Sequence, residues 1–135
     1  MLSAARPRSF PLALTGLALG NFLASTHSTF SLGICVASIL TVTCLQVLSN
    51  FANDYGDFVN GADNANRIGP ARAVQSGSIS LNAMKVAIGL LVGVSFISGN
   101  YLLYLSSKNV DIFALIGMLA IGLLAILAAV RKSIG

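Results

Sequence analysis

The feature that most constrains this chain is a long run without formal charge. From Ser9 to Asn53 the sequence contains no Asp, Glu, Lys or Arg, and Val86–Ser107 and Ile112–Val130 are two further charge-free stretches. Because a helix needs about 20 predominantly apolar residues to cross the hydrocarbon core of a bilayer, these stretches can hold four membrane spans. The composition agrees, since 56% of the residues are hydrophobic and 9% are charged, a balance that a soluble core could not bury. We therefore predict an all-α, polytopic transmembrane helix bundle.

Polar residues divide these stretches into separate helices. The first run is long enough for two spans, and the polar turn Ser25–Ser31 separates them. The second helix stays in phase into the polar segment that follows it. We expect a single domain, residues 1–135, with helices at about 10–24, 32–52, 81–105 and 112–130 and a polar motif loop at 53–80. Because the chain stops directly after the fourth span, we also expect it to be the N-terminal part of a larger transmembrane domain.

The basic residues indicate topology rather than nucleic-acid binding. The net charge is +4. Seven of the eight Lys and Arg residues gather at span ends on one side, namely Arg6, Arg8, Arg67, Arg72, Lys85, Arg131 and Lys132, whereas Lys108 is balanced by Asp111 at an opposite turn. By the positive-inside rule, the N-terminus, the segment 54–85 and the C-terminal end lie in the cytosol. The apolar stretch after Arg8 is longer than the core of a signal peptide, so we expect no cleaved leader. The expected partner is the lipid bilayer, with no nucleic acid.

One polar segment, Asn50–Gly77, carries three of the four acidic residues of the chain. If the second helix continues into it, Asn50, Asn53, Asp54 and Asp57 follow one another at i, i+3, i+4 and i+7, which places them on one helix face. Magnesium prefers oxygen ligands and is usually held by one or two carboxylates together with substrate phosphates. Two arginines further along, Arg67 and Arg72, could fold back onto the remaining phosphate oxygens. The segment therefore suggests a magnesium–diphosphate site at the membrane surface.

Other interpretations of this segment stay open at the level of composition. Asn, Asp and Gly are common turn residues, so hydrated Asp side chains in an ordinary polar loop would give a similar composition. An ion-binding membrane transporter is a second alternative, although it predicts acidic residues deeper within the spans. A purely structural membrane subunit is a third, and it gives no reason for Asn53, Asp54 and Asp57 to share a face.

The order of residues in the segment resembles the first aspartate-rich motif of the UbiA-type membrane prenyltransferase superfamily. That motif reads Asn-Asp-x-x-Asp-x-x-x-Asp and is followed by a basic residue and Arg-Pro-Leu-x-x-Gly. Asn53, Asp54 and Asp57 match its first three positions, and the fourth falls on Gly61, which departs from the pattern. A two-residue insertion brings Asp63, Arg67, Arg72 and Gly77 into line with the remaining positions. The variant Asn-x-x-Asn-Asp-Tyr-x-Asp from Asn50, the Arg-Ile-Gly-Pro-x-Arg from Arg67 and the stretch Ala4–Ala13 resemble the menaquinone branch, the 1,4-dihydroxy-2-naphthoate polyprenyltransferases.

The resemblance implies a fold and a reaction. The fold would be nine transmembrane helices around a central cavity, of which this chain would hold about four helices and half of the active site. The reaction would be Mg²⁺-dependent transfer of a polyprenyl chain from polyprenyl diphosphate to 1,4-dihydroxy-2-naphthoate, with loss of diphosphate and CO₂, giving demethylmenaquinone. Another aromatic acceptor, such as 4-hydroxybenzoate, is the alternative within the superfamily.

The same resemblance implies roles for individual residues. The expected metal ligands are Asn53, Asp54, Asp57 and Asp63, and the expected diphosphate-binding residues are Asn50, Arg67 and Arg72. Asp54 and Asp57 would be the catalytic pair. The protein would be a multi-pass protein of the bacterial inner membrane with the motif on the cytosolic side. Residues 1–135 alone would be inactive without the missing C-terminal half.

Two further residues near the motif have alternative interpretations. Tyr55 could contact an aromatic substrate or stabilise a cation through its ring face, or it could simply pack at the membrane interface. Lys85 is interpreted first as an anchor at the cytosolic end of a span, with contact to the diphosphate as the less favoured alternative.

Overall fold

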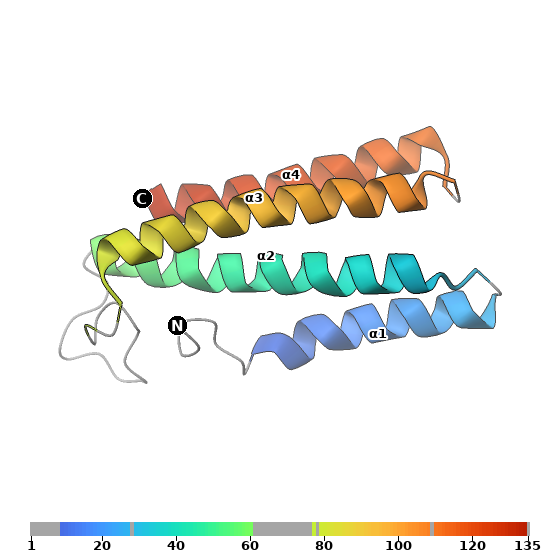
Figure 1. The fold of residues 1–135 in the computed structure, drawn as a ribbon, viewed down its shortest axis with the longest axis horizontal. Helices are drawn as coiled ribbons and strands as arrows, with labels where there is room; N and C mark the ends of the chain where they lie inside the picture. The colour runs from blue at the N-terminus through green and yellow to red at the C-terminus, as the bar shows by residue number, and fades with distance from the viewer. Residues whose placement is uncertain (1–8, 28, 61–76, 78, 109, 135) are drawn as a thin grey trace.

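The described part of the chain folds into four helices that run alternately up and down (Figure 1). The structure is a computed structural model, and it describes residues 9–27, 29–60, 77, 79–108 and 110–134. The helices are α1 (Phe10–Thr26), α2 (Leu32–Val59), α3 (Leu81–Ser106) and α4 (Ile112–Ile134), and these described residues include no β-strand. In Figure 1, α2 lies between α1 on one side and α3 with α4 on the other. The prediction of an all-α bundle of about four helices is confirmed.

The helix ends follow from local sequence. A proline occupies the first turn of α1, where its missing N–H is not needed. The hydroxyl of Ser80 accepts a hydrogen bond of 3.2 Å from the backbone N–H of Ala83 and so caps α3. In the same way, the Asp111 carboxylate accepts one of 2.9 Å from the backbone N–H of Ala114 at the start of α4. These caps replace backbone partners that the first turn of a helix lacks.

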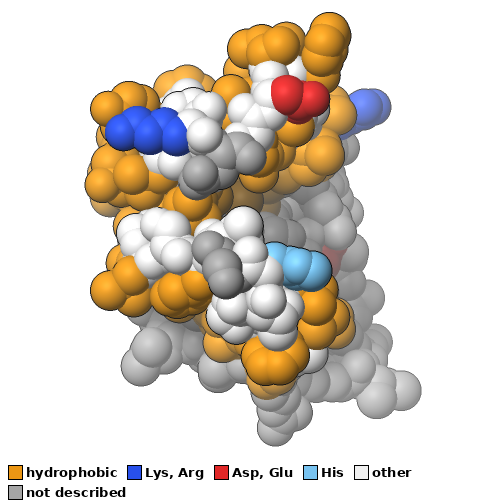
Figure 2. Space-filling model, turned by 90° about the vertical axis from the view of Figure 1, so that its right-hand side faces the viewer, with side chains coloured by type: hydrophobic (Ala, Val, Ile, Leu, Met, Phe, Trp, Pro, Cys, Tyr) orange, Lys and Arg blue, Asp and Glu red, His pale blue; other side chains and the backbone are white. Residues whose placement is uncertain are grey.

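Three helices are long and apolar enough to cross a membrane, namely α2, α3 and α4. The first helix, α1, is apolar but has 17 residues, which gives a length of about 25 Å, at the lower limit for a span. Large apolar side chains are exposed along the bundle, with Leu12 84% and Phe113 79% exposed. Figure 2 looks onto the end of the bundle away from the polar motif and shows hydrophobic side chains with few charges between them. The apolar side chains exposed along the length of the helices suit a lipid environment, and the chain is a membrane protein.

The best-packed part of the bundle lies where α2 ends and α3 begins, which we call the motif end. Its buried cluster consists of Leu48, Phe51, Ile79, Met84 and Ile88. Leu48 and Met84 are fully buried. The cluster holds the last turns of α2 against the first turns of α3. The termini of the described chain also lie toward this end (Figure 1).

The second helix is longer than its apolar run. The charge-free sequence suggested an end near residue 52 and a polar loop from 53 to 80, whereas α2 continues to Val59. The continuation is packed, because Asp54 and Gly56 are buried. The first part of the polar motif, up to Val59, is therefore helical, contrary to the predicted loop from residue 53.

Candidate functional site

The polar side chains at the end of α2 form one stripe. Asn50, Asn53, Asp54 and Asp57 all lie within the helix, so their spacing of three and four residues aligns them on one face. Asn50 and Asp54 are 5% and 1% exposed, and Asn53 and Asp57 are half-buried. A buried carboxylate is costly unless it has polar partners, and both Asp54 and Asp57 have interaction partners in the structure.

The stripe is attached to the beginning of α1 through Ser9. The Asn50 amide donates a hydrogen bond of 3.2 Å to the Ser9 hydroxyl, and the Gln46 amide donates one of 3.0 Å to the same oxygen. Ser9 precedes α1 at its N-cap position but makes no side-chain capping bond there. The Ser9 hydroxyl thus bonds to side chains of α2 rather than capping α1, and this contact holds the Asn50 side chain in place.

Sequence reasoning did not identify Ser9 or Gln46 as part of the site. Gln46 could have been identified from its spacing, because it lies one helical turn before Asn50 on the same helix face. No sequence pattern identifies Ser9, since its contact with α2 depends on how α1 packs against α2. With Gln46 added, the polar stripe consists of Gln46, Asn50, Asn53, Asp54 and Asp57.

The remaining predicted site residues, Asp63, Arg67 and Arg72, lie outside the residues that the structure describes. Their roles in binding metal and diphosphate stay predictions. Among the described residues there is no cluster of three or more His, Cys, Asp or Glu side chains. The stripe supplies instead two carboxylates and neighbouring amide oxygens. That donor set fits Mg²⁺, which takes hard oxygen ligands and fills its other positions with water and substrate phosphate.

A cavity of about 520 Å³ lies at the motif end and is lined by residues of α2, α3 and α4. Its polar lining comes from Tyr55 on α2 and Lys85 on α3, and the rest of its lining is Val59, Ile88, Gly89, Val92 and Val130. The Lys85 ammonium nitrogen lies 5.8 Å from the centroid of the Tyr55 ring, within range of a cation–π contact. The two residues that sequence analysis considered separately are therefore neighbours.

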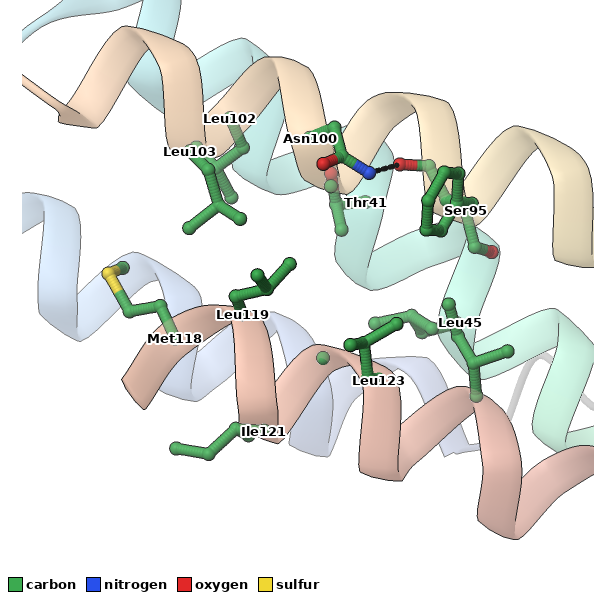
Figure 3. A pocket seen from close by; sticks show the side chains of 14 residues that line it. Thr41, Leu45, Ser95, Asn100, Leu102, Leu103, Met118, Leu119, Ile121 and Leu123 are labelled. Atoms are coloured by element: carbon green, nitrogen blue, oxygen red, sulfur yellow. Dashed lines mark hydrogen bonds between the residues drawn. The ribbon is translucent and has the colours of Figure 1, made fainter. Parts of the chain in front are cut away.

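A second cavity, of about 280 Å³, lies deeper in the bundle between α2, α3 and α4. Figure 3 shows its lining, with Thr41 and Leu45 from α2 and Leu119 and Leu123 from α4. The lining is mostly aliphatic. Among the few polar groups is the Ser95 hydroxyl, which is buried without a hydrogen-bond partner among the described residues.

Together, the fold and the stripe define a class: a polytopic membrane protein with carboxylate and amide side chains gathered at one end of a long helix. Comparison with known proteins then gives the family. The chain is 44% identical over 97% of its length to the 1,4-dihydroxy-2-naphthoate octaprenyltransferase of Haemophilus influenzae, and 37% identical over 99% to that of Escherichia coli. It is 28% identical over 88% to the protein of the same name from Bacillus subtilis. The chain is thus homologous to bacterial proteins that carry the name of the branch the motif resembles, which confirms that resemblance.

The matches cover only part of the relatives. The chain spans 42% of the Haemophilus protein and 43% of the Escherichia protein. No family model matches the chain, and no solved structure matches it. More than half of each of these two relatives thus lies outside the aligned region.

Proposed function

We propose that this chain forms part of an enzyme that transfers a polyprenyl chain from polyprenyl diphosphate to 1,4-dihydroxy-2-naphthoate. The observation that carries the proposal is the 44% identity to a protein named for this activity over 97% of the chain. The polar stripe on α2 supports it, because it offers oxygen ligands where the motif of the superfamily has its aspartates.

The reaction balances as follows. The bond between the allylic carbon and the diphosphate oxygen breaks, and its electron pair leaves with the diphosphate. The naphthoate ring carbon that bears the carboxylate forms the new carbon–carbon bond. That carboxylate leaves as CO₂, and its bonding pair restores the aromatic ring. The product is the reduced quinol form of demethylmenaquinone, and its quinone form follows only after loss of two electrons and two protons to an oxidant.

The described residues would bind and orient the diphosphate. Asn53 and Asp57 are half-buried and could reach a ligand from the end of α2. Asp54 is 1% exposed and would orient its neighbours or complete the ligand set from inside. Bound Mg²⁺ would supply positive charge that stabilises the departing diphosphate. Asn50, held by Ser9, would present its amide oxygen toward the same face.

The proposed role of Arg67 and Arg72, binding the diphosphate, follows from their positive charge. The motif places three carboxylates, Asp54, Asp57 and Asp63, near a substrate that is itself strongly anionic. Like charges at this spacing repel one another, so such a site needs cations beyond a metal ion. Guanidinium groups bind phosphate oxygens in a bidentate manner. We propose that Arg67 and Arg72 bind the diphosphate, with Asp63 as the further metal ligand.

The membrane setting suits a long apolar substrate. Polyprenyl tails partition into hydrocarbon, and the aliphatic cavity between α2, α3 and α4 offers space for part of such a tail. We propose that the protein lies in the bacterial inner membrane with the motif end in the cytosol, where the soluble aromatic acid and diphosphate are available. The rest of the site, including a second aspartate-rich motif, would come from the region that corresponds to the unaligned part of the relatives.

The transporter interpretation is less well supported. It predicts acidic side chains within the spans. In the described helices, Asp54 and Asp57 lie near the end of α2, and Asp111 directly precedes α4. No other acidic residue occurs in the described part of the chain.

The proposal is tested with membranes isolated from cells that express the complete reading frame. Polyprenyl diphosphate and magnesium are supplied together with either 1,4-dihydroxy-2-naphthoate or 4-hydroxybenzoate, and the lipid extract is assayed for prenylated product and the gas phase for CO₂. We expect product and CO₂ with the naphthoate alone, and loss of turnover on chelation of the metal. Exclusive transfer to 4-hydroxybenzoate would refute the acceptor assignment. Measurable turnover by residues 1–135 alone would refute the claim that this region is half of the site.

A further inference from the structure

We propose that Gln46 and Thr43 bind a ring hydroxyl of the aromatic acceptor, one and two helical turns inward from Asn50 on the face of α2 that carries the polar stripe. This inference rests on the proposed function for the identity of the acceptor. It goes beyond that function by assigning the acceptor to the inward end of the stripe, on the same helix face as Asn53 and Asp57.

Thr43 extends the polar stripe by one further turn. It precedes Gln46 by three residues and Asn50 by seven within α2, so the three side chains share one helix face. Thr43 and Gln46 are both half-buried. They lie within the long charge-free run, where polar side chains are costly and often mark a functional site. The stripe thus reaches from the motif end into the apolar part of α2.

The contacts of Gln46 leave its amide oxygen as a hydrogen-bond acceptor. The amide nitrogen of Gln46 donates to the Ser9 hydroxyl at 3.0 Å. Among the hydrogen bonds of the described residues, none ends on the Gln46 amide oxygen. An amide oxygen accepts hydrogen bonds and cannot donate them. It therefore suits a hydroxyl group of a ligand and not a phosphate oxygen or a carboxylate.

Thr43 supplies the complementary donor. Ser and Thr side chains in helices commonly bond back to a carbonyl of the preceding turn, as Thr41 does to the Ala37 carbonyl at 2.8 Å. In the described part of the chain, Thr43 makes no such bond, so its hydroxyl can donate to a ligand. A phenolic hydroxyl both donates and accepts. The Gln46 oxygen and the Thr43 hydroxyl together would satisfy it.

The position along α2 fits the order in which the two substrates must lie. With the diphosphate at Asn53 and Asp57, the tail extends toward the apolar layer, and the reacting allylic carbon lies inward of the diphosphate. Gln46 is a further four residues inward of Asn50, which corresponds to about 6 Å along the helix axis. A hydroxyl across the ring from the carboxylated carbon lies less than one helical turn from that carbon. A ring bound at Gln46 thus presents the carboxylated carbon near Asn50.

The chemistry of the acceptor indicates which hydroxyl is bound. In 1,4-dihydroxy-2-naphthoate, the 1-hydroxyl is adjacent to the carboxylate and donates to it within the molecule. The 4-hydroxyl has no such internal partner, and in an apolar surrounding it needs one from the protein. The hydroxyl at Gln46 and Thr43 is therefore the 4-hydroxyl.

A plain structural role for Gln46 makes a different prediction. Its bond to Ser9 joins α2 to α1, and side-chain amides often link membrane helices in this way. Such a link affects the packing of the two helices. It does not distinguish a hydroxylated ring from the same ring without the hydroxyl, and that distinction is the basis of the experiment.

The experiment measures direct binding to the complete protein in lipid nanodiscs. The radiolabelled probes are 4-hydroxy-2-naphthoate and 2-naphthoate, which differ by the 4-hydroxyl. For Gln46→Met we expect the dissociation constant of the hydroxylated probe to rise about five- to tenfold, as for the loss of one hydrogen bond, and that of 2-naphthoate to change less than about twofold. Asn21→Leu is the control, because it removes an amide that bonds to the Leu17 carbonyl within α1, and it should bind both probes like the wild type.

Thr43 is tested with the same probes and a matched pair of variants. Thr43→Val should weaken binding of the hydroxylated probe about three- to tenfold and leave that of 2-naphthoate unchanged. Thr41→Val is the same substitution two residues earlier, on the opposite face of α2, and should leave both dissociation constants unchanged. Retained binding of 2-naphthoate shows in each case that the variant is folded.

Equal effects of Gln46→Met on the two probes would overturn the inference. So would a Thr43→Val variant that binds the hydroxylated probe as well as Thr41→Val does. Failure of the proposed function gives a different result. In that case the wild type would transfer no prenyl group to the naphthoate, while the hydroxyl-dependent binding at Gln46 and Thr43 would still be measured.

Discussion

Replacement of Ser9 by alanine tests how the polar stripe is held in place. The substitution removes the oxygen that accepts hydrogen bonds from Gln46, at 3.0 Å, and from Asn50, at 3.2 Å. It should leave the helix propensity of α1 nearly unchanged, because the Ser9 side chain makes no capping bond. The predicted effect is therefore a loss of contact between α1 and α2.

The structure sets the size of this effect. A neutral hydrogen bond contributes about 1 kcal/mol net, and a buried donor left without a partner costs about 1–3 kcal/mol. Side-chain bonds between membrane helices average about 0.6 kcal/mol. The substitution removes two such bonds, so we expect a total of about 1–2 kcal/mol. That corresponds to a change of roughly 5- to 30-fold in the unfolding equilibrium.

The assay is equilibrium unfolding of the purified complete protein in mixed micelles, followed by far-UV circular dichroism during titration with a denaturing detergent. Ser31→Ala is the matched control, since Ser31 is likewise an N-cap residue without a side-chain capping bond. If Ser9→Ala is no more destabilising than Ser31→Ala, the connection from Ser9 to the stripe contributes nothing and the reasoning fails. Under the proposed function, Ser9→Ala should also raise the KM for polyprenyl diphosphate, because the orientation of Asn50 is lost.

Three further predictions concern single positions. Asp57→Asn should reduce prenyl transfer by the complete enzyme at least 100-fold (about 2.7 kcal/mol of transition-state stabilisation), whereas Asp111→Asn at the other end of the bundle should retain activity. Turnover within tenfold of the wild type for Asp57→Asn would exclude it from the site. Gly77 has φ of +74°, so Gly77→Ala should cost roughly 1–2 kcal/mol in the unfolding titration, while Gly16→Ala, in open space on α1, should cost nothing measurable. Ser80→Ala should cost about 1 kcal/mol through loss of the α3 cap, and an unchanged midpoint would show that this cap does not contribute to stability.

The sequence predicted the helices well because the bilayer limits the choices. Charge-free runs of spanning length can hardly form anything but helices, and the starts expected at 10, 32, 81 and 112 agree with the observed starts of the four helices. The end of α2 was less predictable. Apolar periodicity stops near Ala52, but backbone hydrogen bonding does not depend on apolar side chains, and α2 continues to Val59.

The candidate site was predictable where it follows from helix geometry. The common face of Asn50, Asn53, Asp54 and Asp57 needed only the helical repeat. Contacts between elements could not be deduced in this way. The bond from Asn50 to Ser9 and the approach of Lys85 to Tyr55 depend on how α1 and α3 pack against α2, and no local pattern encodes that packing.

The extension of α2 also bears on how the site can work. A carboxylate on a loop must be ordered when its ligand binds, which costs conformational entropy. Asp54 and Asp57 instead lie on a helix whose preceding turns are fixed by buried Leu48 and Phe51. They differ in access, since Asp54 is 1% exposed and Asp57 is half-buried. We infer that Asp57 is the residue that meets the ligand first and that Asp54 fixes the geometry behind it. The pair would then act as a preorganised half-site, because its position is set by the bundle before any substrate arrives.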